Sequence, residues 1–362
     1  MYNPMPAKES ANSPSCARKG KVNTMKNITI SMFVLIALLF GMSAISYGQG
    51  FSNVGYAGAN FLKIPVEPVG AALGNSLVAS AEGVTGLYWN PGAIAFTEGT
   101  EIALSRVSWL SDTKVSFFGV TQKLGPGVLG LSVTALTMDD MEITTETSPN
   151  GTGTYFGSGS YALSLSAAAK IIDRFSFGLS VKYVYEYIWE TNASTYAFDF
   201  GSVYMTDFHN MRIGMRLANF GAEAVFAGSP IDNKAGVVAQ SGISYSYDPR
   251  LERVSKEYPL PQIFNVGISI DPVAMDGHKV TITAAVNDPN DNNSQLQFGA
   301  QYGFEDMLFI RAGYKSGYDE QNLSVGLGVK AGFQGIDSRL DFAYAAFGRL
   351  GGTSFLSLRV GF

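Results

Sequence analysis

After residue 100, bulky apolar residues alternate with small or charged residues along most of the chain. The alternation is clearest over 174–190, where one face carries Phe175, Phe177, Leu179, Val181, Tyr183, Tyr185, Tyr187 and Trp189, and the other carries Ser176, Gly178, Ser180 and Lys182. It recurs over 321–333, with Leu323, Val325, Leu327 and Val329 opposite Ser324, Gly326, Gly328 and Lys330. Because successive side chains of a β-strand point to opposite faces, these segments predict strands with one apolar face and one small or polar face.

The same pattern predicts about fourteen strands. They are expected near 100–109, 113–123, 127–137, 154–170, 174–190, 194–206, 211–220, 262–271, 278–287, 294–304, 307–316, 321–333, 337–347 and 353–362. Most have about ten residues, the length with which a tilted strand crosses a bilayer. A soluble β-sandwich also alternates, but does not normally sustain the pattern over fourteen segments. We therefore predict an all-β fold, an antiparallel transmembrane β-barrel of about fourteen strands over residues 100–362.

The lengths of the connections alternate as well. Every second connection is short, at 124–126, 171–173, 207–210, 271–277, 305–306 and 334–336. The other set contains both long segments, 138–153 and 221–261. In outer-membrane barrels the periplasmic turns are short and the external loops are longer. We therefore expect a cell outer membrane protein that spans the lipid bilayer many times, with its short turns in the periplasm.

The last eight residues alternate strictly, and Leu356, Leu358, Val360 and Phe362 share one face. A strand that closes on a terminal aromatic residue suits the last strand of a barrel better than the end of a soluble domain. This ending resembles the carboxy-terminal recognition signal of bacterial outer-membrane proteins. The resemblance implies that the barrel-assembly machinery is a partner.

Residues 1–48 predict a pre-region and a secretory signal peptide. Lysines precede the apolar run over 28–45, at Lys19, Lys21 and Lys26, and small residues follow its densest part. A permanent helical anchor would need about twenty apolar residues without this small-residue exit. We expect cleavage after Gly48; Met25 offers an alternative start, since it would itself begin a well-formed signal. The single cysteine, Cys16, leaves with the signal, which excludes a disulfide framework and thiol chemistry from the mature chain.

Residues 49–99 lack sustained alternation, are rich in Gly and Ala, and predict an amino-terminal plug or hatch segment of the barrel. Within them stands the turn Tyr88, Trp89, Asn90, Pro91, Gly92, for which we expect a structural role because proline fixes φ and Asn bonds nearby backbone groups. The stretches FLKIPVEPVGAALGNSLVAS and GLYWNPGAIA resemble the amino-terminal signature of the PorV/PorQ family. That family is similar to FadL-type transporters, whose hatch contains an Asn-Pro-Ala-Gly turn; here Asn90-Pro91-Gly92-Ala93 has the last two positions exchanged.

The resemblance implies two functions of different class. PorV-like proteins bind cargo of the type IX secretion system, receive it from the translocon and pass it to the attachment machinery. FadL-like proteins transport long-chain fatty acids or other hydrophobic compounds past the hatch. Many inward-facing positions are Ser, Gly, Lys and Thr, which favours the protein-handling role, with the translocon and its cargo as partners; the FadL-like role is the alternative.

The long segment 221–261 is where we expect an external partner or ligand to touch the protein. Its aromatic and basic residues suit an interface: Tyr245, Tyr247, Arg250, Arg253 and Tyr258. The alternative is a loop that folds over the barrel mouth and touches nothing.

Other chemistry finds little support in the sequence. The two histidines, His209 and His278, fall in or beside expected periplasmic turns, and we predict no enzymatic activity, no catalytic residues and no cofactor. The acidic loop 287–293 has oxygen ligands of the kind calcium prefers, but it lacks a spaced bidentate glutamate, so no metal site is predicted. A net charge of −5 argues against a nucleic-acid partner.

Overall fold

The computed structural model describes residues 54–228 and 255–362, all within one compact unit, Ser52–Phe362. The expected signal peptide therefore lies outside the described residues. Fourteen long strands form the barrel: β1 (Thr100–Ser108), β2 (Lys114–Leu124), β3 (Gly127–Thr137), β6 (Ser158–Ile172), β7 (Phe175–Ile188), β8 (Thr191–Met205), β9 (Arg212–Gly221), β11 (Ile263–Met275), β12 (His278–Pro289), β13 (Gln295–Phe304), β14 (Leu308–Ser316), β15 (Leu323–Phe333), β16 (Ile336–Ala346) and β17 (Gly352–Gly361). Three short strands, β4 (Met141–Glu142), β5 (Tyr155–Phe156) and β10 (Ala227–Gly228), lie in the long connections.

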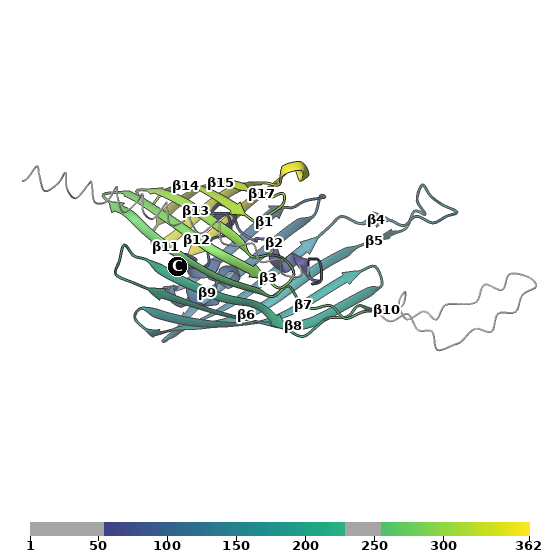
Figure 1. The fold of residues 1–362 in the computed structure, drawn as a ribbon, viewed down its shortest axis with the longest axis horizontal. Helices are drawn as coiled ribbons and strands as arrows, with labels where there is room; N and C mark the ends of the chain where they lie inside the picture. Colours follow the sequence, from purple (N-terminus) through teal and green to yellow (C-terminus); the bar gives the residue numbers. More distant parts are fainter. Residues whose placement is uncertain (1–53, 229–254) are drawn as a thin grey trace, which may run out of the picture. The chain divides into compact units, whose positions relative to one another are not determined.

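The strands form a closed antiparallel barrel (Figure 1). Strand β1 pairs with the last strand, β17, from Glu101 opposite Gly361 to Ser108 opposite Ser354, and pairing of β8 with β9 completes the ring. The prediction of an antiparallel barrel of about fourteen strands is confirmed. We call the end with the short connections the periplasmic end and the other the external end, following the general rule for such barrels.

Two expected strands differ from the observed ones. The strand expected at 154–170 is divided into β5 and β6, and the strand expected to end near residue 271 continues as β11 to Met275. The ladder between β11 and β12 shifts register between Ile270 and Val273, where Pro272 has no N–H to donate. The chain therefore bulges at the proline instead of turning there, and it turns at Asp276 and Gly277, which both have positive φ.

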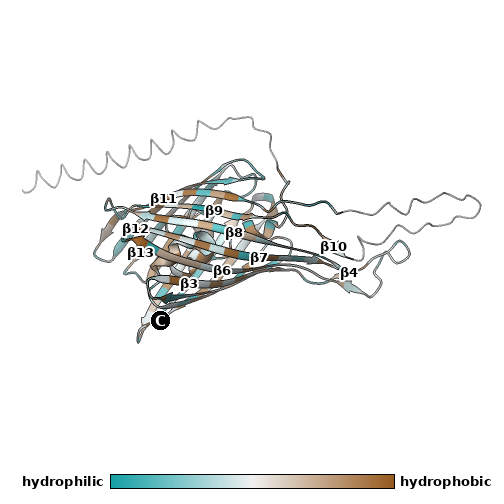
Figure 2. Ribbon diagram, turned by 90° about the horizontal axis from the view of Figure 1, so that it is seen from below, coloured by the Kyte–Doolittle hydropathy of each residue, from teal (hydrophilic) through white to brown (hydrophobic). Residues whose placement is uncertain are grey.

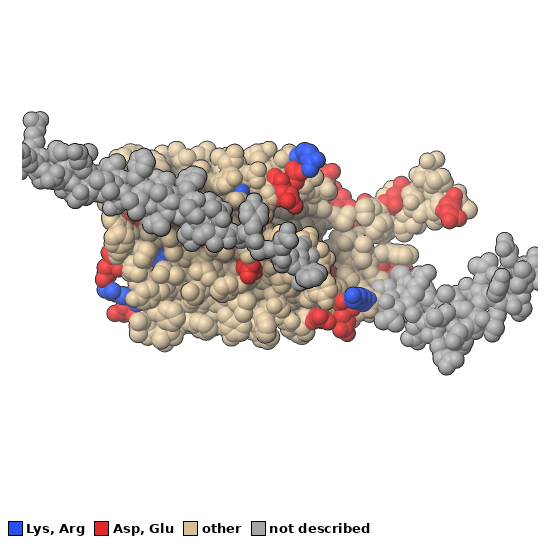
Figure 3. Space-filling model, viewed as in Figure 1, with Lys and Arg blue, Asp and Glu red and all other residues tan. Residues whose placement is uncertain are grey.

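The outer surface of the wall is apolar. In β7 the side chains of Phe177, Leu179, Val181 and Tyr183 are exposed, whereas the residues between them are buried on the inner side. Figure 2 shows brown, apolar positions along the strands, and in Figure 3 the charged side chains of the visible face gather near the two ends of the barrel. A closed barrel with such a surface satisfies its backbone groups internally and suits contact with lipid tails.

Outward-facing aromatic residues form bands at both ends of the wall. The external band on β6, β7 and β8 contains Tyr161, Tyr183, Tyr185, Tyr187 and Tyr196; Tyr187 contacts Tyr161 and Tyr185, and Tyr183 contacts Tyr196. The periplasmic band contains exposed Tyr204, Tyr302, Phe304, Phe333 and Phe362. Aromatic girdles of this kind mark the two membrane interfaces. The protein is thus a multi-pass β-barrel of the outer membrane; in its described part, the helices are all too short or too polar to cross a bilayer.

Residues 57–97, which we call the lumenal segment, pack inside the barrel. They form five short helices: η2 (Asn60–Lys63), α2 (Pro68–Ala72), η3 (Gly83–Thr85), α3 (Gly86–Trp89) and η4 (Pro91–Phe96). Almost all of this segment is buried, and α2 and η4 contact inward-facing residues of β6, β7, β8, β14, β15, β16 and β17. These short helices have little periodicity, so their conformation depends on the wall around them.

Glycines on the inner wall allow the backbone of the lumenal segment to approach the strands directly. A methyl group at these positions would overlap the segment: Gly178 against Pro91, Gly201 against Asn90, Gly214 against Val78, Gly299 against Leu73, Gly313 against Gly74 and Gly326 against Ala72. Wall hydroxyls bond the same backbone, since Ser176 donates to Gly92 O at 2.9 Å and Ser324 donates to Ala72 O at 3.2 Å. The small inward-facing residues therefore serve as a docking surface.

We predict that Gly201→Ala loosens the lumenal segment without opening the barrel. The added methyl group must displace the Asn90 side chain and Pro91, and overpacking of this kind costs roughly 1–3 kcal/mol. Limited proteolysis of the folded protein should then cut within residues 57–97 faster than in the wild type. The matched control is Gly332→Ala, whose methyl group would meet only the end of the Asp337 side chain; equal cleavage rates in the two variants would contradict the docking role of Gly201.

Candidate functional site

The candidate site is the lumen and the segment that fills it. At the external end, Gly58 N donates to Pro259 O at 3.0 Å, and Lys63 pairs with Asp291 of the β12–β13 loop at 2.6 Å. Toward the periplasmic end, Glu82 pairs with Arg212 of β9 at 2.6 Å. The lumenal segment therefore runs down the lumen from the external rim to the periplasmic mouth before it enters β1.

The turn Tyr88, Trp89, Asn90, Pro91, Gly92 lies against the wall in the middle of this path. Asn90 is fully buried and acts as the amino-terminal cap of η4, because its Oδ1 accepts from Gly92 N at 3.0 Å. Its Nδ2 donates to Val78 O at 2.8 Å and to Ser202 O of β8 at 3.0 Å. One side chain thus joins two parts of the lumenal segment to a strand.

The two aromatic residues of the turn hold the rest of the lumenal segment. Tyr88 donates its hydroxyl to Ile64 O at 2.7 Å, and Trp89 donates its indole N–H to Glu67 Oε1 at 2.9 Å. Burial raises the pKa of the Tyr88 hydroxyl, which therefore stays protonated and able to donate. These contacts tie the turn to η2 and to the start of α2.

Glu67 caps α2 from a buried position. Its carboxylate accepts from Gly70 N at 3.2 Å as well as from Trp89. Burial, reinforced by the nearby Asp341, raises the pKa of Glu67 to about 7, although Arg359 and the two hydrogen bonds oppose the shift. Glu67 therefore changes charge near neutral pH inside the lumen.

On the side of β1, β2 and β17, the external half of the lumen is apolar; we call this region the apolar chamber. Its wall residues are Val107, Val115, Phe117 and Phe355, and Leu260 and Phe347 close it at the external rim. Phe61 and Leu62 of η2 fill it, and both are buried. Trp109 packs edge-to-face on Phe347 with ring centroids 5.1 Å apart. This half has the lining of a site for apolar molecules, with side chains of the protein itself in place of a ligand.

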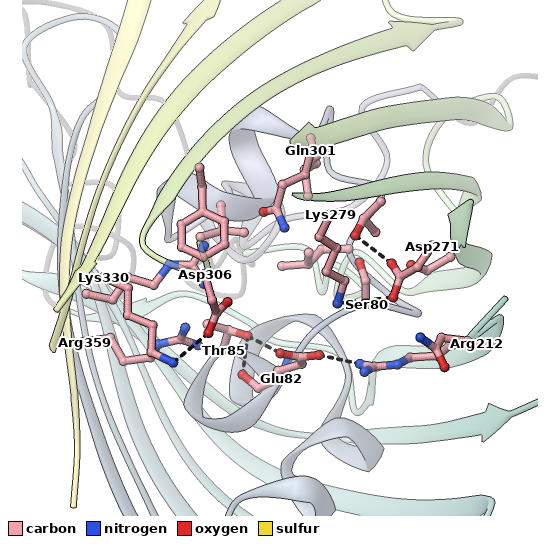
Figure 4. A pocket seen from close by; sticks show the side chains of 18 residues that line it. Ser80, Glu82, Thr85, Arg212, Asp271, Lys279, Gln301, Asp306, Lys330 and Arg359 are labelled. Carbon is pink, nitrogen blue, oxygen red and sulfur yellow. Dashed lines mark hydrogen bonds and ion pairs between the residues drawn. The ribbon is translucent and has the colours of Figure 1, made fainter. Parts of the chain in front are cut away.

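The periplasmic half holds a polar cavity of about 200 Å³, which we call the basic vestibule (Figure 4). Five cationic residues line it, Arg212, Lys279, Lys330, Arg339 and Arg359, together with three carboxylates, Glu82, Asp271 and Asp306. Lys279 pairs with Asp271 at 3.2 Å, and Lys330 pairs with Asp306 at 3.1 Å. The lumen thus contains an apolar chamber toward its external end and a charged vestibule toward its periplasmic end.

A buried ion network holds the wall next to the lumenal segment. Asp199 accepts from Lys182 at 2.7 Å and from Arg216 at 2.9 Å, and its other oxygen accepts from Asn219 N at 2.9 Å. Here β8 and β9 shift register, and Asn219 has a positive φ of 58°. The Arg216 guanidinium also lies over the ring of Tyr88, 5.5 Å from its centroid. The irregular pairing of β8 with β9 is therefore stabilised by paired charges, and one of these, Arg216, also contacts Tyr88 of the turn.

Of the residues expected to contact an external partner, Tyr245, Tyr247, Arg250 and Arg253 lie outside the described residues. Tyr258 is described and packs at the barrel mouth: its ring lies against Gly58, and its hydroxyl donates to Glu186 at 2.9 Å. Burial, together with Glu186, raises the pKa of this hydroxyl. The end of the long segment thus folds into the mouth and covers the start of the lumenal segment.

The other residues singled out in the sequence, at the carboxy terminus and the two histidines, lie apart from the lumen. Leu356, Leu358 and Phe362 are exposed on the outer face of β17 with Val360 beside them, so their role as an assembly signal stays a prediction. The two histidines are exposed at the periplasmic end, where the imidazole Nδ1 of His278 lies 2.7 Å from Tyr302 Oη. Among the described residues, no group of three or more His, Cys, Asp and Glu side chains could hold a metal ion.

Sequence reasoning missed the alignment of charges in the vestibule. Lys330, Arg339 and Arg359 stand directly opposite one another across β15, β16 and β17. The signal was available, because short hairpin turns fix the register of the strands that they join. Counting outward from the turn at 334–335 places Lys330 opposite Arg339.

Comparisons with known proteins support the fold. No protein-family model matches the chain, and no curated protein matches it. The toluene transporter TbuX of Ralstonia pickettii is 12% identical, with 81% of this chain and 96% of that chain covered and a TM-score of 0.50. A FadL homologue of Pseudomonas aeruginosa is also 12% identical, with 82% and 98% covered and a TM-score of 0.48. At this identity the similarity shows the fold alone, a closed β-barrel like that of TbuX.

We predict that Glu67→Gln removes a pH dependence from the lumenal segment. The pKa of Glu67 is raised in the folded state, so its protonated form stabilises helix α2 below about pH 4.5, and that contribution is lost as the pH rises through about 7. The difference amounts to roughly 3 kcal/mol at most. Glutamine can still accept from Gly70 and Trp89, so amide exchange over 70–73 should be slower in the variant than in the wild type at pH 8.

At pH 4 the same variant should exchange at nearly the wild-type rate, because Glu67 is then neutral as well. Glu320→Gln serves as a control, since Glu320 is a surface carboxylate far from this helix in the β14–β15 connection. An identical pH dependence in the wild type and in Glu67→Gln would contradict the assignment.

Proposed function

We propose that the protein transports apolar small molecules across the outer membrane, with the apolar chamber as its ligand site. The observation that carries this proposal is the buried apolar lining of the external half of the lumen, which Phe61 and Leu62 occupy. A ligand that displaces these side chains would exchange one set of apolar contacts for another, at little cost in buried area. The FadL-type fold, and the toluene that the TbuX structure names as its cargo, support the same ligand class.

This proposal reverses the preference stated from the sequence. The small and polar inward-facing residues favoured protein handling because they suggested a wet lumen. In the structure many of them contact the lumenal segment instead, as Gly178 and Ser176 do with η4. Their composition therefore reflects the docking of this segment and carries no information about cargo.

We predict that Phe61→Ala creates space for an apolar ligand and strengthens its binding. The probe is bromobenzene, a heavy-atom quencher. The reporter is Trp109 at the chamber rim, whose fluorescence is the difference between a Trp189→Phe protein and one that also carries Trp109→Phe, because Trp89 emits in both. Quenching should saturate, with an apparent affinity roughly fivefold or more above that of the unaltered chamber, since burial of a phenyl-sized group contributes a few kcal/mol.

The matched control is Phe342→Ala, which removes the same group from the outer, lipid-facing surface of β16. It should leave the quenching curve of the parent unchanged. Quenching that rises linearly without saturation in all variants would show that the probe only partitions into detergent, and the transport proposal would then lose its ligand site.

A second candidate is the protein-handling role, in which the barrel resembles PorV/PorQ proteins and binds type IX cargo at the cell surface. The observation that favours it is the external rim: β6 and β8 have 15 residues each, and the rim carries exposed Tyr155 and Trp189. Such aromatic residues suit a protein partner. Native mass spectrometry of the barrel extracted from its own membrane decides between the two: stoichiometric translocon or cargo proteins favour this role, and a lone barrel with a bound lipophile favours transport.

A further inference from the structure

Three cations stand side by side on the inner wall of the basic vestibule. In the ladder of β15, β16 and β17, Lys330 lies directly opposite Arg339, and Arg339 lies directly opposite Arg359. All three line the same cavity. Like charges directly opposite each other destabilise a sheet, so this alignment needs compensation.

The compensation weakens along the row. Lys330 has two carboxylates, Asp306 at 3.1 Å and Asp337 at 3.5 Å. Arg339 pairs with Asp341 at 3.0 Å, but that carboxylate also binds Arg311, at 2.9 Å. Within the described part of the chain, Arg359 makes neither an ion pair nor a hydrogen bond, and the buried Nη2 of Arg339 has no hydrogen-bond partner. Among the described residues, Arg359 is therefore the member of the row that has no direct ionic partner.

The opposite side of the vestibule adds to this positive potential. Arg212 and Lys279 line the same cavity (Figure 4), which has five cations against three carboxylates. Burial alone would raise the pKa of the Glu82 carboxyl, yet Arg212, Lys279 and Arg359 outweigh it and hold that pKa below its usual value. The cations around Glu82 therefore stabilise its charged form.

We propose that the row of Lys330, Arg339 and Arg359 binds a small oxyanion, a carboxylate or phosphate group, that enters from the periplasmic end. Guanidinium groups match such anions in geometry and can bind them through two parallel hydrogen bonds. A cavity of about 200 Å³ holds a group of this size. An anion placed between Arg339 and Arg359 gives Arg359 an ionic partner and relieves the repulsion along the row. This site is distinct from the apolar chamber and does not depend on the transport proposal.

The test is isothermal titration of the purified mature barrel in a non-ionic detergent at pH 7 and low salt. One arm uses inorganic phosphate and the other uses hexanoate, which separates a phosphate-bearing ligand from a carboxylate-bearing one. Saturable binding at one site in either arm supports the proposal. Arg359→Gln should weaken that binding at least tenfold, and Arg359→Lys, which keeps the charge, should restore most of it.

The matched control is Lys114→Gln, which removes one positive charge at the external end, where Lys114 pairs with exposed Asp139. It should bind the anion as the wild type does. Folding of each variant is checked by its altered mobility in unheated gels; if Arg359→Gln does not assemble, Lys330→Gln tests the same row without altering β17. Absence of binding in both arms, or equal affinity in the wild type and the row variants, overturns the proposal.

Discussion

The structure depends on the close approach of the lumenal segment to a wall that has glycine or a small hydroxyl residue at many points of contact. Gly178, Gly201 and Gly313 each leave a place that segment backbone or a capping side chain occupies. Glycine in a strand loses packing and conformational entropy, so its repeated use on one face has a cost that direct docking of another backbone offsets. The same contacts satisfy the backbone groups of short helices that would not form alone in water.

This docking also explains the division of the lumen. The segment enters beside the external rim with η2, where Phe61 and Leu62 complete an apolar cluster, and leaves beside the periplasmic mouth, where Glu82 meets Arg212. Glu67 and the turn at Asn90 lie between the two halves, bound to each other through Trp89. The parts of the lumenal segment in the two halves are therefore joined by a small number of buried polar contacts. One of these involves Glu67, whose pKa of about 7 lies near neutral pH.

The strands could be predicted because the membrane on one side and the lumen on the other make apolar and polar residues alternate along each strand. Pro272 misled only the prediction of where one strand, β11, ends. The path of the lumenal segment could not be predicted, because its contacts join residues far apart in the sequence, such as Asn90 with Ser202 and Lys63 with Asp291. The turn at Asn90 has local chemistry that the sequence shows, since Asn and Pro favour turns, but its partners across the lumen lie far away in the sequence. The apolar chamber could not be predicted, because its inward-facing residues, such as Val107 and Phe355, come from strands far apart in the sequence.

The most direct test of this account is a disulfide between the lumenal segment and the wall. Ser76 Oγ lies 2.5 Å from Thr283 Oγ1, and the only natural cysteine, Cys16, precedes the expected cleavage site. The account predicts that Ser76→Cys with Thr283→Cys cross-links quantitatively in intact outer membranes, while Ser76→Cys with Thr281→Cys does not. Unpaired cysteines that react with a maleimide in both proteins would show that the segment does not dock on the wall, and would contradict the central claim.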